Sequence, residues 1–514
     1  MKRMCTSLFG LTLIITVMVF CATASAEKPP MPPDELRCEY FRNPVGIDVS
    51  SPRLSWQIKS TRQGVMQTAW QIIVAGSPET LAKNEGDLWD SGKVMSDQSV
   101  FVPYAGTPLQ SRQACFWKVR VWTDGNTPSP WSEPGSWTMG LLTAEDWQAD
   151  WIGADWMENN EGPLPWLRKT VTLDKAPSKA TAYVAALGYY ELYVNGKKVG
   201  DNVLVPAVTN YAKRGLYITQ DITPYLTKGE NAVALWLGRG WSLFMLEAAS
   251  QTGPLVRAQF EINHGDNTPL IIATDATWKT HPSPITPLGA MRSGNYGGER
   301  YDARLELPNW ATAELDDSNW SNAIVATPPT PVVSAQNVEP NRILGDVKPA
   351  AVKKQEDGSF LIDMGKNYVG WLEMKFPDGS AGTVVKFEYG DTFRDNGELQ
   401  SYRQHDEYVI SGKGSERFCS RFNYHAFRYV IVRGLDTAPD LKDIHGHWIS
   451  TAYDRATTFS CSNDLLNRIY DTITWTYRCL TLGGYTVDCP HRERLGYGGD
   501  SGTSMEMGLA NFHL

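Results

Sequence analysis

The sequence has little positive charge, few cysteines and no long apolar run beyond residue 22. Its 514 residues contain 48 Lys and Arg against 57 Asp and Glu, a formal net charge of −9. Because phosphate backbones are bound by basic surfaces, this balance argues against a nucleic-acid partner. The run from Leu8 to Ala22 is shorter than the roughly 20 apolar residues that a spanning helix needs. We therefore expect neither a nucleic-acid partner nor a membrane span.

The first 26 residues have the layout of a cleaved secretory signal. Lys2 and Arg3 precede the apolar run, and Ala24-Ser25-Ala26 closes it with small residues. We expect residues 1–26 to be a signal peptide and the mature protein to be secreted or periplasmic. Removing the signal makes the remainder more acidic by two charges.

Cysteine use does not indicate a disulfide-stapled fold. Of the eight cysteines, six follow the predicted signal, and they are scattered through a long chain: Cys38, Cys115, Cys419, Cys461, Cys479 and Cys489. A disulfide framework is typical of small secreted domains with closely spaced cysteines. The sequence leaves open an isolated pair between Cys38 and Cys115.

Composition and pattern predict several β-sandwich domains. The chain is long enough for about three or four domains, and its 19 Trp, 22 Tyr and 16 Phe suit both β-sandwich cores and the apolar faces of sugars. Alternating runs separated by turn signals predict a fibronectin-like or immunoglobulin-like sandwich over 27–140, a second and larger sandwich over 141–337 and a third β region over 338–452.

Two short segments show the pattern most clearly. Trp117, Val119 and Val121 alternate with Lys118 and Arg120, which predicts a half-buried strand with its charged side chains in solvent. Asn195-Gly196 lies between two alternating runs, and this dipeptide predicts a tight hairpin because both residues tolerate positive φ.

The pattern becomes helical after Phe459. Asn463 can cap a helix, and apolar residues then recur at helical spacing at Leu466, Ile469, Tyr470, Ile473 and Tyr477. A short helical region over 453–514 cannot bury such a stripe by itself. Either it packs on the third sandwich, or the chain is a fragment of a longer protein.

A dense group of charges follows, in the segment 487–500. Three carboxylates and two arginines occur there within 13 residues: Asp488, Arg492, Glu493, Arg494 and Asp500. Pro490 and the glycines at 496, 498 and 499 disfavour a continuous helix, so we expect a folded loop. A glycosidase needs a carboxylic acid and polar groups that grip sugar hydroxyls, and this segment supplies both. The competing interpretation is a structural salt-bridge loop.

Cys489 and His491 have no third ligand nearby, so we assign no metal site.

The segment 487–500 closely resembles the catalytic signature of the bacterial α-L-rhamnosidases of glycoside hydrolase family 78. Further stretches at 38–48, 193–196 and 422–429 look like the family's fibronectin-like, jelly-roll and concanavalin-like β-sandwich modules. The resemblance implies that residues 453–514 begin an (α/α)6 catalytic barrel and that this barrel is incomplete here.

The resemblance also implies roles for single residues. Glu493 matches the family's general acid, while Asp488, Arg492 and Asp500 match residues that hold the rhamnose hydroxyls. Tyr497 stands where the family usually has Trp, and its ring can still stack on the sugar. The family inverts configuration with a second glutamate as base, which we expect beyond residue 514 rather than at Glu506. The family's jelly-roll domain sometimes binds rhamnose with calcium, but we match no calcium ligands and expect no cofactor.

We therefore expect hydrolysis of terminal α-L-rhamnose from a glycoside or plant polysaccharide. Two alternatives are a non-catalytic carbohydrate-binding fragment and a related (α/α)6 glycosidase with another sugar preference. The spacing of Asp488, Glu493 and Asp500 argues against the second alternative.

Overall fold

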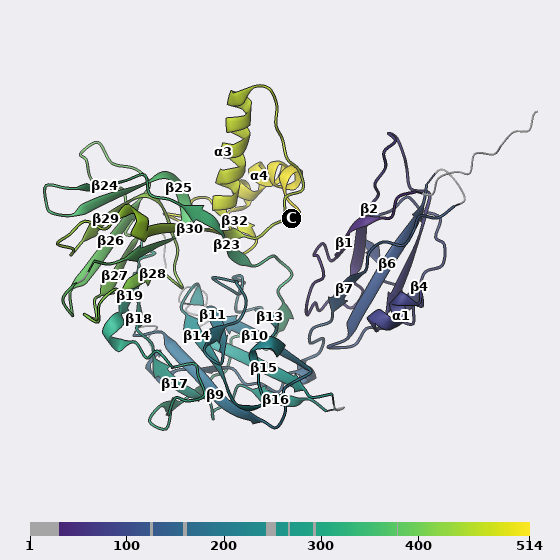
Figure 1. The fold of residues 1–514 in the computed structure, drawn as a ribbon, viewed down its shortest axis with the longest axis horizontal. Helices are drawn as coiled ribbons and strands as arrows, with labels where there is room; N and C mark the ends of the chain where they lie inside the picture. The colour runs from purple at the N-terminus through teal and green to yellow at the C-terminus, as the bar shows by residue number, and fades with distance from the viewer. Residues whose placement is uncertain are drawn as a thin grey trace, which may run out of the picture.

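The computed structural model describes residues 30–123, 127–157, 162–242, 253–265, 268–290, 294–377 and 379–514. The predicted signal peptide, residues 1–26, lies outside the described residues. Most elements are β-strands, and the described part of the chain has three α-helices: α1 (Pro78–Ala82), α3 (Asp464–Leu480) and α4 (Gly498–Asn511). None of these helices combines the length and hydrophobicity required to cross a bilayer. Figure 1 shows the strands grouped into three bodies, with α3 and α4 between the first and the third and above the second.

The first body is a sandwich of two small antiparallel sheets. One sheet has the order β1 (Asp34–Cys38), β2 (Arg53–Gln57) and β5 (Val102–Pro103), and the other has the order β4 (Trp89–Asp90), β3 (Ala69–Ala75), β6 (Ala114–Trp122) and β7 (Gly135–Thr138). Buried side chains from both sheets form one core, including Leu54, Trp56, Ile72, Trp117 and Val119. Cys38 and Cys115 lie in this core. These two cysteines and the other four that follow residue 26 are all free thiols.

Strand β6 corrects one expectation. Trp117, Val119 and Val121 face the core as predicted, but Lys118 is also buried. Its Nζ donates to the carbonyl oxygen of Leu81 in α1 at 2.8 Å and lies over the ring of Trp131. The alternation revealed which face is apolar, but it contained no information on α1 and Trp131, which cover the opposite face.

The second body is a larger sandwich. One sheet has the order β21 (Ile324–Val325), β8 (Ile152–Gly153), β15 (Leu255–Asn263), β10 (Lys179–Leu187), β13 (Gly215–Asp221) and β22 (Val333–Ala335), with β16 (Leu270–Ala273) also paired to β15. The other has the order β12 (Lys197–Lys198), β11 (Tyr189–Val194), β14 (Gly229–Gly238), β9 (Pro165–Leu173), β17 (Lys279–Pro282) and β20 (Ser321–Asn322). The predicted hairpin joins β11 to β12, with φ of 50° at Asn195 and 77° at Gly196.

The third body is built from one ten-stranded sheet. Its order is β18 (Ile285–Leu288), β19 (Gly298–Asp302), β27 (His405–Val409), β26 (Val384–Gly390), β29 (His425–Arg433), β25 (Phe360–Lys375), β30 (Ile444–Thr451) and β23 (Asn341–Val347), and β24 (Ala351–Lys354) and β28 (Arg417–Cys419) also pair with β25. A register shift between Asp363 and Tyr368 divides the 16-residue strand β25 into two parts, one pairing with β24 and the other with β28 and β30.

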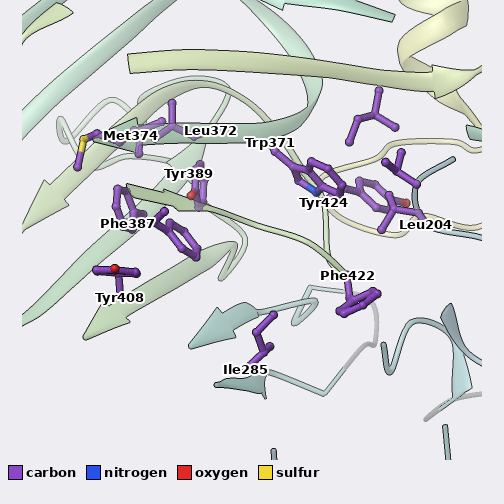
Figure 2. Close-up of a cluster of buried hydrophobic side chains, with 14 of the residues drawn as sticks. Leu204, Ile285, Trp371, Leu372, Met374, Phe387, Tyr389, Tyr408, Phe422 and Tyr424 are labelled. Carbon is purple, nitrogen blue, oxygen red and sulfur yellow. The ribbon is translucent and has the colours of Figure 1, made fainter. Parts of the chain in front are cut away.

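Two strands of this sheet, β18 and β19, come from the segment that precedes our boundary at residue 337. The second and third bodies are therefore interleaved in sequence. Their shared core also contains side chains from both segments, such as Trp166, Ile285 and Phe387. Figure 2 shows this core extending from Met374 and Tyr408 to Phe422, Tyr424 and Leu204.

Helix α3 begins where the sequence predicted, since the Asn463 side chain accepts from the backbone N–H groups of Leu465 and Leu466. It packs on the third body through Trp475, whose ring lies 4.6 Å from that of Trp448 and whose Nε1 donates to the Asn367 carbonyl oxygen. The predicted apolar stripe lies on the other side. Leu466, Ile469 and Ile473 remain 45–49% exposed.

The short elements complete the description. They are the two-stranded sheet β31 (Thr481–Leu482) with β32 (Tyr485–Thr486), and the 3-10 helices Ala144–Asp146, Asp155–Met157, Thr223–Tyr225, Ala303–Leu305 and Leu441–Asp443.

Candidate active site

The charged segment 487–500 lies between β32 and α4, and it is only partly a loop. Residues 487–497 are irregular, as expected, but α4 begins at Gly498 and therefore includes Gly499 and Asp500. Tyr497 has extended backbone angles and ends the loop. Glycines at a helix start carry little penalty, and Asp500 in the first turn interacts favourably with the helix dipole. The expectation of a loop throughout was therefore wrong for residues 498–500.

The buried side chain of Arg494 fixes the loop to the third body. Its guanidinium donates to the carbonyl oxygen of Pro490 at 2.9 Å, to Oδ1 of Asn423 at 2.8 Å and to the carbonyl oxygen of Tyr424 at 2.6 Å. It also lies 4.4 Å and 4.1 Å from the ring centroids of Tyr296 and Tyr424. Arg494 is 0% exposed, and burial lowers the pKa of its guanidinium. Neutral oxygens and aromatic rings surround this cation.

The backbone beside Arg494 is held in the same way. The Tyr296 hydroxyl donates to the carbonyl oxygen of Glu493, and the Gly294 N–H donates to the carbonyl oxygen of Arg492 at 2.7 Å. The backbone at Arg494 has a φ of 55° and its N–H donates to the Cys489 carbonyl oxygen. The backbone carbonyl groups of Arg492 and Glu493 thus accept hydrogen bonds from the protein, and their side chains remain at the surface.

The Glu493 carboxyl group is held at both oxygens. Oε1 lies 2.9 Å from Nη2 of Arg492, and Oε2 accepts a hydrogen bond from the Tyr497 hydroxyl at 2.9 Å. The Glu493 side chain is 27% exposed, so a ligand can reach it. The hydrogen bond to Glu493 raises the pKa of the Tyr497 phenol. Of the two arginines that flank Glu493 in sequence, only Arg492 forms an ion pair with it.

Asp488 closes the loop from the other side. Its backbone N–H donates to the Leu495 carbonyl oxygen at 3.0 Å, and its carboxylate accepts from Cys489 Sγ at 2.9 Å and from the Leu495 N–H at 3.3 Å. Burial opposes ionisation of Asp488, but these hydrogen bonds and one with the Glu493 side chain outweigh it and lower the pKa of Asp488. The structure therefore brings together Asp488, Arg492, Glu493 and Tyr497.

Asp500 is positioned differently from the other four. It lies in the first turn of α4, and its backbone oxygen accepts from Ser504 Oγ at 2.7 Å. No hydrogen bond or ion pair within the described residues joins its carboxylate to the other predicted site residues.

A buried polar network supports the segment to which Arg494 is bound. Oδ2 of Asp406 accepts from Tyr389, Ser420 and His425, and the Glu299 carboxyl oxygens accept from the N–H groups of Arg421 and Phe422. Burial raises the pKa of Glu299 to about 8, and the neighbouring Asp406 charge adds to the effect. The network fixes the backbone just before Asn423 and Tyr424.

Sequence reasoning missed the residues that position the loop. It treated Arg494 as a charge beside Glu493, whereas the side chain points into the protein. It noted the segment 422–429 but assigned no role to Asn423 or Tyr424. The only available signal was that an arginine follows Glu493 directly, and sequence spacing does not reveal the direction in which its side chain points.

The cysteine and the histidine of the loop each contact another side chain. Cys489 Sγ bonds to Asp488, and the His491 ring packs 4.8 Å from the Tyr402 ring. In the described ranges, one group of three side chains has metal-ligating atoms close together, and it is Glu373, Cys419 and His447. A sulfur and a nitrogen do not suit calcium, which takes six to eight oxygen ligands.

A cavity of about 230 Å³ lies behind the loop, between α3 and the third body. Trp475, Cys479, Pro490 and His491 are among the residues that line it, and Glu493 is not. Glu493 therefore does not contribute to this cavity. A half-exposed carboxyl group beside an arginine and an aromatic ring, on a chain of β-sandwich domains, has the parts of a modular glycoside hydrolase.

Comparison with known families identifies the domains. Four family models match in succession: a Rha78A-like N-terminal immunoglobulin domain over 33–143, an α-L-rhamnosidase N-terminal domain over 175–345, a bacterial α-L-rhamnosidase concanavalin-like domain over 353–450 and a bacterial α-L-rhamnosidase 6 hairpin glycosidase domain over 454–513. The first match identifies an immunoglobulin-like rather than a fibronectin-like domain.

Individual relatives agree. An α-L-rhamnosidase of Formosa agariphila is 32% identical over 99% of this chain and 57% of its own length. The structure of the α-L-rhamnosidase from Dictyoglumus thermophilum matches with a TM-score of 0.88 and 34% identity, over 94% of this chain and 56% of that one. The Streptomyces avermitilis α-L-rhamnosidase, complexed with L-rhamnose, matches with a TM-score of 0.83 and 25% identity, over 94% and 63%.

The chain belongs to the bacterial α-L-rhamnosidase family, glycoside hydrolase family 78. It spans just over half the length of the curated relatives it matches.

Replacing Arg494 with Met should release the loop. The variant loses three hydrogen bonds and two ring contacts, which we expect to cost about 3 kcal/mol locally and to accelerate amide hydrogen exchange in 487–497 roughly a hundredfold. Arg494→Lys should not restore slow amide hydrogen exchange in 487–497, because an ammonium group cannot reproduce the planar set of donors. The matched control, Arg492→Met, removes a half-exposed arginine and should change exchange little. Equal exchange in the Arg494 and Arg492 variants would contradict the anchoring role.

Glu299 should make stability fall with rising pH. The folded carboxyl group has a pKa of about 8 against an ordinary 4.5, so between these values the folded state holds a proton that the unfolded state releases. Stability should decline across this window by up to about 1.4 kcal/mol per pH unit. Urea unfolding at several pH values measures the slope, which Glu299→Gln should flatten. An unchanged slope in that variant would assign the pH dependence to other groups.

Proposed function

We propose that this chain supplies the general acid of an inverting α-L-rhamnosidase, with Glu493 as the proton donor. The observation that carries the proposal is the geometry around Glu493. Its carboxyl group lies at the surface, where Arg492 and Tyr497 orient it. The loop that carries it is bound to the third body by the buried Arg494 side chain. The named relatives are α-L-rhamnosidases, and one of their structures is a complex with L-rhamnose, which supports rhamnose as the sugar.

In this mechanism Glu493 transfers its proton to the glycosidic oxygen as the bond between that oxygen and the sugar's anomeric carbon breaks. A water molecule attacks the anomeric carbon from the opposite face and gives its proton to a second carboxylate. In inverting enzymes the two carboxyl groups lie roughly 6.5–9.5 Å apart, which leaves room for this water. Asp488 does not fit the role of base, because its oxygens accept hydrogen bonds from Cys489 and Leu495 inside the loop.

The remaining predicted residues would bind the sugar. Arg492 presents donors to hydroxyl groups at the surface, and the Tyr497 ring, 46% exposed, offers an apolar face for stacking. Asp500 has a carboxylate without a protein partner among the described residues, so both oxygens are available to accept from hydroxyls. Asp488 holds the loop together through its hydrogen bonds with Cys489 and Leu495.

We also infer that α3 and α4 open an (α/α)6 barrel. The match to the six-hairpin domain model covers 454–513 and supports this inference. The exposed stripe of Leu466, Ile469 and Ile473 supports it independently, because an apolar helix face of this width is ordinarily covered. The second catalytic carboxylate would then come from a later part of the barrel. The leader sequence supports a secreted or periplasmic location.

The first test is hydrolysis of α-L-rhamnosides by this chain together with any coding sequence that continues it. Glu493→Gln should lower kcat/KM by about a thousandfold on a rhamnosyl disaccharide, whose leaving group needs a proton. On an aryl rhamnoside with an acidic phenol the loss should be much smaller, because that leaving group departs without protonation. The control, Glu506→Gln, changes an exposed glutamate on α4 and should retain full activity.

Equal losses on both substrates would exclude Glu493 as the acid. Rhamnoside binding without turnover by the folded, extended wild-type protein would instead favour a carbohydrate-binding fragment.

Variants at Tyr497 distinguish the contribution of ring stacking from that of the hydrogen bond to Glu493. Tyr497→Phe keeps the ring and removes the hydroxyl that donates to Glu493 Oε2, so we expect kcat to fall about tenfold with little change in KM. Tyr497→Trp keeps a stacking surface and should preserve KM as well. A variant series in which KM changes and kcat does not would assign Tyr497 to sugar binding alone.

A further inference from the structure

A second group of chemically reactive side chains lies on the third body, away from Glu493. Glu373 on β25, Cys419 on β28 and His447 on β30 place one ligand atom each within 4.8 Å of one another. Within the part of the chain that the structure describes, the ion pairs of Glu373 and His447 are with each other, Arg417 and Asp346, and none reaches the loop 487–497.

The sheet itself creates this cluster. Glu373 pairs directly with Cys419 across β25 and β28, and with His445 across β25 and β30. His447, two residues further along β30, lies diagonally from Glu373, and it pairs with Asp346 on β23. Four neighbouring strands thus contribute a row of side chains to one face. Figure 1 shows β23, β25 and β30 together below α3.

The three ligand types are those of a zinc site. A thiolate, an imidazole and a carboxylate bind zinc at about 2.0–2.3 Å, which spaces ligand atoms in a tetrahedron by roughly 3.3–3.8 Å. Here the Glu373 Oε2 to His447 Nε2 distance is 3.0 Å, and all three atoms fall within 4.8 Å. Small side-chain rotations would close this set around one ion.

The surroundings match a metal site in two further respects. Oδ1 of Asp346 lies 3.4 Å from Nδ1 of His447, the nitrogen that would not bind the metal, and such a carboxylate orients a ligating histidine. Arg417 pairs with the other Glu373 oxygen, Oε1, and leaves Oε2 directed at His447. The two positive charges of a zinc ion would neutralise the Glu373 carboxylate and a Cys419 thiolate. The formal charges of Arg417 and Asp346 then sum to zero.

We propose that Glu373, Cys419 and His447 bind one zinc ion, with Asp346 as the partner that orients His447. Glu373 and His447 are each 19% exposed, so water can occupy the fourth position. Zinc binding at this place ties β28, β25 and β30 together. The proposal does not depend on rhamnosidase activity.

The test uses the full chain, treated with a chelator, dialysed and then titrated with Zn²⁺ or Co²⁺. We expect one equivalent of zinc to bind and to raise the thermal unfolding midpoint by several degrees. Cobalt should give a visible tetrahedral spectrum together with a thiolate-to-cobalt charge-transfer band. Cys419→Ser and His447→Gln should abolish the stoichiometric binding, and Cys419→Ser should remove the charge-transfer band.

Two controls guard against indirect effects. Cys461→Ser removes an exposed thiol outside the cluster and should leave zinc binding and the cobalt spectrum unchanged. Asp346→Asn should weaken zinc binding by about ten- to a hundredfold without abolishing it. Circular dichroism of each metal-free variant verifies that it is folded. Failure of the folded wild-type chain to bind zinc, or binding that survives Cys419→Ser, would overturn the proposal and leave an ordinary ion-pair cluster.

Discussion

The burial of one guanidinium group determines how the candidate site is built. Arg494 is fully enclosed, and the oxygens that satisfy it come from Asn423, Tyr424 and Pro490 rather than from a carboxylate. Leaving such donors unpaired would cost several kcal/mol, so the loop cannot move away from the third body without breaking all of these contacts together. The Glu493 carboxyl group therefore lies on the irregular loop that precedes α4, and a β-sheet domain fixes the position of this loop.

The same constraint extends through the second body. Arg421 lies two residues before Asn423. Its side chain forms an ion pair with Glu191 of β11 and donates a hydrogen bond to the Tyr193 hydroxyl at 3.0 Å. Its guanidinium also lies 4.4 Å from the Trp236 ring of β14. The segment 421–424 thus binds the second body through Arg421 and the loop through Asn423 and Tyr424. The β-domains act as the rigid support on which the Glu493 carboxyl group is oriented, and this gives a physical reason for their presence beside the segment that matches the six-hairpin glycosidase domain.

Local signals in the sequence predicted what depends on local physics. The Asn195-Gly196 hairpin and the Asn463 cap are confirmed because backbone angles and capping are decided within a few residues. The burial of Lys118, the inward direction of Arg494 and the cluster of Glu373, Cys419 and His447 depend on which strands pair. Residues 373, 419 and 447 are distant in sequence, and no spacing rule connects them. Likewise, Asp488, Arg492, Glu493 and Tyr497 were predicted as site residues from a short segment, whereas Tyr296 and Asn423, which anchor that segment, were not predicted.

Helix α3 has an apolar side that the third body does not cover. Trp475 and Cys479 occupy one side of the helix and pack on the sheet, while Leu466 and Ile473 lie on roughly the opposite side and stay exposed. Near its end α3 is covered by α4, where the Tyr477 and Phe512 rings stack at 5.5 Å. A helix that is apolar on two opposite sides is stable when both sides are covered. The sheet covers one side of α3, while the side that carries Leu466 and Ile473 has no covering element among the described residues.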